Sequence, residues 1–137
     1  MDNGGDNSNT VPRNIIPGNI KSVYPTDEQT DKLREALKVQ VEYDYFEDNR
    51  AEDLPVIDAV IEYMTEMLAN SSTKINGTVQ SSEALSKYIS QMDSCALLEF
   101  LSNMKDKSFK DVSNKAAYWR SSIINFLRER AAELVTA

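Results

Sequence analysis

The sequence of 137 residues lacks histidine and has a single cysteine, Cys95. An internal disulfide is therefore impossible, and Cys/His zinc sites and Ser-His-Asp or Cys-His catalytic sets are excluded. The four glycines, at positions 4, 5, 18 and 77, cannot form a G-x-x-x-x-G-K-[ST] or G-x-G-x-x-G phosphate loop. A D-x-[DN]-x-[DN]-G calcium loop is also missing. These absences argue against an enzyme, and we expect neither a cofactor nor a metal.

Long hydrophobic runs are missing as well. The apolar runs extend over only a few residues, whereas a membrane-spanning helix needs roughly 18–20. The first residues, Met1-Asp2-Asn3-Gly4-Gly5-Asp6, do not resemble a signal peptide. The composition, 41% hydrophobic and 27% charged, is typical of a globular protein. We therefore expect a cytoplasmic protein without a membrane segment.

Two regions differ in composition. Residues 1–23 are rich in Asn, Gly, Asp, Ser and Pro and have no sustained apolar period, which predicts a disordered tail or linker. Residues 24–137 contain recurring apolar positions. We interpret them as one helical domain.

Helical periodicity dominates this second region. Leu33, Leu37 and Val41 predict a helix over roughly 27–41. Asp53 as N-cap and Pro55 in the first turn predict the start of a helix over 54–69. Further helices are predicted around residues 85–92, after a cap at Ser81 or Ser82, around 97–104, after Asp93 or Ser94, and from Asn114 to about Leu134.

The dipeptide Asn76-Gly77 between two short β-prone pieces predicts a small hairpin over about 74–79. The expected fold is therefore all-α, a compact bundle of five to six helices with one small β-hairpin. Its core should include Cys95 as a small buried residue and two or three rings from a helical turn or loop at 43–46. It should also contain the methionines Met64, Met67, Met92 and Met104. The last helix should add one apolar face, formed by Trp119, Ile123, Phe126, Leu127 and Leu134.

Charge is unevenly distributed. The net charge is −7; residues 1–104 carry 8 basic and 18 acidic side chains, and residues 105–137 carry 7 basic and 4 acidic ones. Either both halves are ordinary solvated faces, or the basic end contacts phosphates while the acidic half binds a basic partner. In the second case an exposed aromatic beside Lys115 and Arg120, such as Tyr118, is suited to stacking on a base. The helix over 54–69 offers an acidic partner-binding face through Asp58, Glu62 and Glu66, which are four residues apart.

From Leu33 to about Leu127 the order of features resembles the C-terminal domain of RepA_N-type plasmid and mobile-element replication initiators of Gram-positive bacteria. The matching pieces are Tyr24-Pro25, Leu33-Arg34-Glu35, Val41-Glu42-Tyr43-Asp44, Ile57-Asp58-x-Val60-Ile61, Met64-x-Glu66, Ile75-x-Gly77, Met92-Asp93-Ser94 with Leu97, Phe100-Leu101 and Met104, and Val112-x-Asn114 with Tyr118. The resemblance implies recruitment of replication proteins rather than catalysis. The origin-binding winged-helix part of such initiators is not in this chain.

That domain is in turn similar to the DnaD-like domain of primosome proteins, in which one helix contacts DNA. Asn114-Lys115-Ala116-Ala117-Tyr118 matches the opening of this helix, and Ile123 matches its second aliphatic position. Ser122 stands at the first aliphatic position and Phe126 at the tryptophan position. The implied DNA-binding residues, together with the basic residues of this helix, are Lys115, Tyr118, Arg120, Phe126 and Arg128.

Three functions follow as hypotheses. The leading one is a non-enzymatic interaction domain of a replication initiator that recruits primosome proteins, namely primase or the helicase-loading machinery. The alternative is a DnaD-like module that binds single-stranded DNA weakly. The second alternative is a small regulatory or structural helical protein unrelated to replication.

Overall fold

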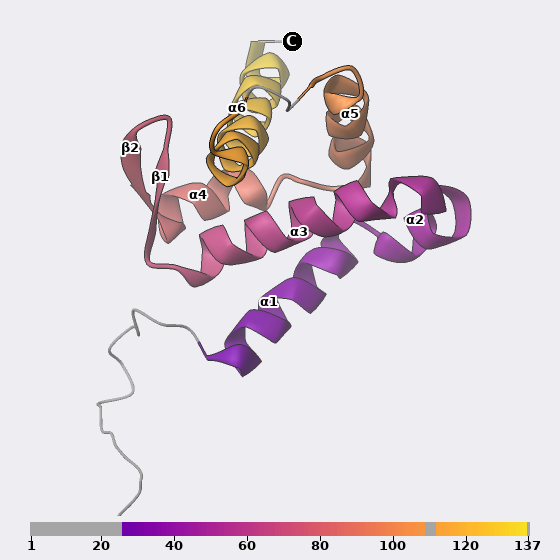
Figure 1. Cartoon of the computed structure of the whole chain (residues 1–137), viewed down its shortest axis with the longest axis horizontal. Coiled ribbons are helices and arrows are strands. Elements are labelled where there is room, and N and C mark those ends of the chain that lie inside the picture. Colours follow the sequence, from indigo (N-terminus) through magenta and orange to yellow (C-terminus); the bar gives the residue numbers. More distant parts are fainter. Residues whose placement is uncertain (1–25, 109–111, 137) are drawn as a thin grey trace, which may run out of the picture.

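The computed structural model describes residues 26–108 and 112–136. The predicted tail over 1–23 lies outside them. Within the described part, helices and one hairpin follow each other along the chain in this order (Figure 1): α1 Asp27–Gln40, α2 Tyr43–Asn49, the 3₁₀ helix η1 Ala51–Asp53, α3 Leu54–Ala69, β1 Ser72–Ile75, β2 Thr78–Ser81, α4 Ser82–Ile89, α5 Ser94–Met104 and α6 Lys115–Thr136. The prediction of a helical fold with a small hairpin is confirmed.

Helix starts are fixed by local capping. Thr26 begins α1 with a capping box: its hydroxyl accepts from the Gln29 amide, and the Gln29 side chain accepts from the Thr26 amide. Asp93 caps α5 by accepting from the Ala96 amide at 2.8 Å. Asp53 is the N-cap residue of α3, as predicted, but its side chain makes no capping hydrogen bond. The preceding 3₁₀ turn keeps Asp53 in a helical conformation, and its carboxylate accepts from Arg50 Nε at 2.9 Å instead.

The hairpin forms as predicted and is slightly longer than 74–79. Ser72 pairs with Ser81 and Ile75 with Thr78 in an antiparallel register. Asn76 and Gly77 have φ values of 53° and 82°, as a tight type I′ turn requires. The Ser81 hydroxyl then accepts from the Ala84 amide and starts α4.

Helix α3 lies at the centre of the fold (Figure 1). Helix α1 packs along it, and α6 packs against α3, α4 and β1. Gln40 joins α1 to the end of α4, because its Nε2 donates to the carbonyls of Ile89 and Met92 at 2.8 and 2.9 Å. The four methionines predicted in the core are all buried, which confirms that interpretation.

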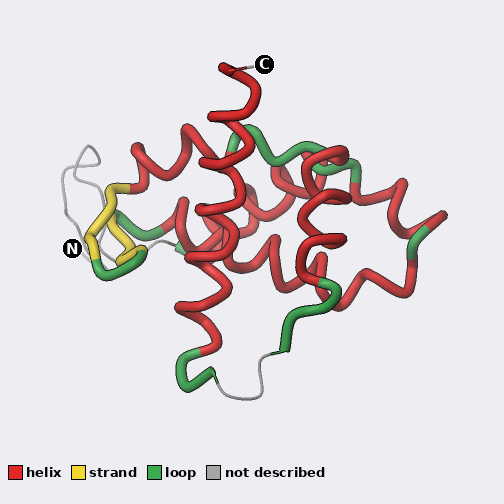
Figure 2. The backbone as a smooth tube through the Cα atoms, turned by 90° about the horizontal axis from the view of Figure 1, so that it is seen from above, coloured by secondary structure: helices red, strands yellow, loops and turns green. Residues whose placement is uncertain are grey.

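Three core predictions need correction. Cys95 is exposed, because it lies on the outer face of α5 while the next residue, Ala96, faces the core. Leu134 is 65% exposed, because the last turns of α6 project beyond the other helices (Figure 2). Of the rings in α2, only Phe46 is fully buried; Tyr43 is half-buried and Tyr45 is 44% exposed.

Candidate interaction surfaces

Two members of the predicted acidic face on α3 pair with side chains of neighbouring helices. The Tyr43 hydroxyl donates to Asp58 at 2.6 Å, which joins α2 to α3. This hydrogen bond and burial raise the pKa of Tyr43 to about 12. Arg34 of α1 donates through two nitrogens to Glu62, at 2.5 and 3.1 Å, and also pairs with Asp31. These contacts raise the pKa of Arg34, so the guanidinium stays charged.

Glu66 is the remaining member of this face. It is exposed, and its carboxylate has no ion-pair or hydrogen-bond partner among residues 26–108 and 112–136. A basic partner would therefore have to compete with Arg34 and Tyr43 for two of the three predicted carboxylates. The acidic face of α3 therefore offers a partner fewer unpaired carboxylates than the four-residue spacing in the sequence predicted.

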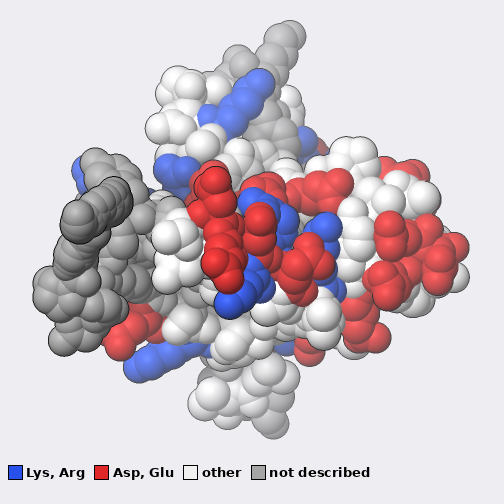
Figure 3. All heavy atoms as spheres, turned by 90° about the horizontal axis from the view of Figure 1, so that it is seen from below, with Lys and Arg blue, Asp and Glu red and all other residues white. Residues whose placement is uncertain are grey.

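A second acidic surface, missed in the sequence, surrounds α2 and η1. We call Asp44, Glu47, Asp48 and Glu52 the acidic lobe. All four are exposed, and none of their carboxylates has an ion-pair or hydrogen-bond partner in the described part of the chain. The end of the molecule formed by α2 carries dense acidic surface in Figure 3. The sequence signal was present, since residues 42–53 contain six acidic residues and one arginine.

The predicted DNA-binding residues on α6 lie in different surroundings. Lys115 is exposed in the first turn, and Tyr118 and Arg120 are half-buried near it. Arg128 lies over the Tyr88 ring of α4, 5.3 Å from its centroid. The five residues therefore do not form one continuous surface.

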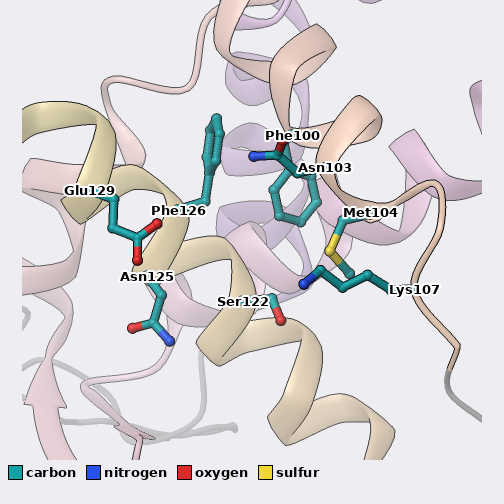
Figure 4. A pocket seen from close by; sticks show the side chains of 8 residues that line it. All are labelled: Phe100, Asn103, Met104, Lys107, Ser122, Asn125, Phe126 and Glu129. Atoms are coloured by element: carbon teal, nitrogen blue, oxygen red, sulfur yellow. The ribbon is translucent and has the colours of Figure 1, made fainter. Parts of the chain in front are cut away.

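Phe126 is removed from the candidate interface. Only 8% of it is exposed, and its ring packs edge-on against Phe100 with 5.4 Å between centroids. It lines a cavity of about 380 Å³ between α5 and α6, with Lys107 and Glu129 among the other lining residues (Figure 4). A ring that fills the core in this way has little surface left for a base.

A different set of residues meets where the hairpin touches α6. A depression of about 420 Å³, which we call the hairpin groove, is lined by Lys74, Asn76, Gly77, Asn114, Ala117, Tyr118, Arg120 and Ser121. The lining has two cations and no acidic residue. Trp119, the neighbour of Tyr118, turns away from the groove and stacks on Tyr63 at 6.2 Å. The structure thus brings two predicted residues, Tyr118 and Arg120, together with Lys74, which the sequence analysis did not single out.

Comparison of the chain with protein-family models, curated proteins and solved structures finds no match in any of the three. The resemblance to replication initiators accordingly remains a prediction. In residues 26–108 and 112–136, no helix combines the length and apolar character that crossing a bilayer requires. Within the same ranges, no three Cys, Asp or Glu side chains are grouped so that they could hold a metal ion.

Proposed function

We propose that this chain is a non-catalytic interaction domain of a plasmid or mobile-element replication initiator, and that it recruits a primosome protein, primase or a helicase loader. The order of motifs from Leu33 to Leu127 supports the link to replication. The observation that carries the recruiting role is the acidic lobe, because its four exposed carboxylates make no ion pair and no hydrogen bond within the described residues.

The partner surface that fits the acidic lobe is basic. The side chains of Arg50 and Asp53 neutralise each other beside it, at 2.8 Å, so the lobe itself keeps a charge of −4 from its four members. Such a field accelerates encounter with a basic partner and is screened as salt increases. The half-exposed Tyr45 ring on the same helix adds apolar contact area of the kind that interfaces favour.

The test is binding of purified primase and helicase loader, each to the wild-type chain and to a variant with Asp44→Asn, Glu47→Gln, Asp48→Asn and Glu52→Gln. We expect tight binding of one partner at low salt and at least a tenfold loss in the variant. A control that removes two exposed carboxylates of α1, Glu28→Gln with Glu35→Gln, should leave affinity nearly unchanged; both of these carboxylates pair with lysines of α1. Equal losses in both variants, or no binding by the wild type, would refute the proposal.

The hairpin groove favours a second candidate, weak binding of single-stranded DNA. Lys115, Tyr118 and Arg120 lie in or near it, and cations with an aromatic ring are suited to a phosphate backbone and a base. The overall charge of −7 opposes such binding at long range, so it should be weak. Because contacts between cations and phosphates release counterions, it should also fade strongly between about 50 mM and about 200 mM salt. Fluorescence anisotropy with a short oligonucleotide measures this directly.

Arg128→Ala is the control for Arg120→Ala in that experiment, because Arg128 lies on α6 away from the groove, over Tyr88. Salt-sensitive binding that Arg120→Ala weakens and Arg128→Ala does not would favour the DNA module. Absence of both protein and DNA binding would leave the regulatory or structural helical protein as the remaining hypothesis.

A further inference from the structure

We propose that the hairpin groove is a binding site for a phosphate group, in which Lys74 of the hairpin and Arg120 of α6 act as a pair of cations. The phosphate source is a nucleic-acid backbone, so this site rests on the second candidate function. It goes beyond that function by assigning the hairpin a part in binding.

The hairpin is held firmly against α6. The Asn76 amide donates to Ser121 Oγ at 3.4 Å, and Asn76 Nδ2 donates to Asn125 Oδ1 at 2.9 Å. Strand β1 also packs on α6. The two walls of the groove are therefore in place before any ligand arrives, which lowers the entropic cost of binding.

The turn leaves room for a ligand beside its backbone. A Cβ atom built on Gly77 would meet no atom within 4 Å, so the space next to the turn is open. The groove volume of about 420 Å³ lies in the range of small-ligand sites. The site can thus admit a phosphate together with part of the group that carries it.

The charge of the lining selects an anion. Lys74 and Arg120, which are 46 residues apart in sequence, line the groove from β1 and α6. Neither has an ion-pair partner in the part of the chain that the structure describes. The other polar lining groups are uncharged: the side chains of Asn76, Asn114, Tyr118 and Ser121. Two cations without a counter-charge at one cavity constitute a site for an oxyanion.

Arg120 supplies an independent observation. Its Nε is buried and has no hydrogen-bond partner among residues 26–108 and 112–136. No acceptor of the described chain therefore neutralises this edge of the guanidinium. Because Nε has almost no accessible surface, an anion in the groove would meet other atoms of the guanidinium, whose planar shape suits phosphate oxygens better than an ammonium does.

The experiment is an amide NMR titration of the full chain, first with inorganic phosphate and then with a short oligonucleotide. We expect saturable shifts concentrated at Lys74, Asn76, Gly77 and Ser121 with both. Lys74→Gln should weaken binding several-fold and reduce the slope of log affinity against log salt by about 1 for the oligonucleotide. Lys74→Arg should keep the wild-type affinity and salt dependence. The control Lys87→Gln, at an exposed position of α4, should change neither.

The outcomes separate the two ideas. Phosphate shifts in the groove without oligonucleotide binding support this site and remove the DNA function. Oligonucleotide binding that Lys74→Gln leaves unchanged supports the DNA function and overturns this site. Shifts scattered over the surface, or no shifts at all, also overturn it. Because Lys74 is exposed, its substitution does not threaten the fold. If Lys74→Gln nevertheless changes the structure, the charge-conserving Lys74→Arg still tests the site.

Discussion

Phe46 anchors the acidic lobe to the core, and its removal makes a quantitative test of the fold. The ring is fully buried, whereas the adjacent Tyr45 is 44% exposed and meets it edge-on at 5.2 Å. Truncating a fully buried Phe to Ala costs about 3–5 kcal/mol. Losing a half-exposed ring and one aromatic pair should cost about 1 kcal/mol. The two variants therefore compare burial between neighbouring residues of one helix.

Urea unfolding followed by far-UV circular dichroism measures both changes. A domain of this size has a total stability of about 5–15 kcal/mol, so Phe46→Ala should remove a large fraction of it. Trp119 fluorescence provides a second probe, because this ring packs on Tyr63 and Phe100 rather than on α2. Equal losses in the two variants, or a loss below about 1 kcal/mol for Phe46→Ala, would refute the inference that α2 is anchored by this ring.

Three further changes have expected results. Tyr43→Phe should destabilise the fold at neutral pH, because it removes the hydrogen bond from the Tyr43 hydroxyl to Asp58. This hydrogen bond raises the pKa of Tyr43 from about 10 to about 12, so the stability that it contributes is fully present below pH 10 and is lost as pH rises through 12. A stability difference between wild type and variant that persists above pH 12 would contradict this. Gly77→Ala should lower stability by about 1–2 kcal/mol through its positive φ alone, since the added Cβ meets nothing within 4 Å; thermal unfolding shows this, and an unchanged midpoint would contradict it. Gln40→Leu leaves the Met92 carbonyl without its side-chain donor, while the Ile89 carbonyl keeps the Met92 amide, and it should cost about 1–3 kcal/mol in urea unfolding; a neutral result would mean that water replaces the Gln40 amide.

Local rules predicted most of the helices. The apolar period over 54–69 gave the bounds of α3 as the structure has them, and Asn76-Gly77 gave the hairpin. These signals depend on residues within a turn or two of each other, where spacing determines conformation. The 3₁₀ turn before α3 was missed because it has no apolar period, and within it the Asp53 carboxylate accepts from Arg50 rather than from an amide of α3.

The candidate surfaces were harder to predict, because they depend on how elements pack. The sequence predicts Glu62 to be a solvated helix residue. It is paired with Arg34 only because α1 lies beside α3 in the folded domain. Likewise, Lys74 and Tyr118 share a groove only because the hairpin folds back onto α6. Phe126 shows the opposite case, since its burial against Phe100 removes a residue that the family resemblance had implied.

The position of α6 has a consequence for synthesis of the chain. Helix α3, in the middle of the sequence, packs against α6, and α6 is translated last among the described elements. Buried residues of both helices, among them Ile61 and Ile123, belong to one core cluster, so on the ribosome the earlier helices lack part of their apolar cover until α6 has emerged. A nascent chain arrested just before α6 leaves the exit tunnel should therefore bind chaperones more strongly than one from which α6 has emerged.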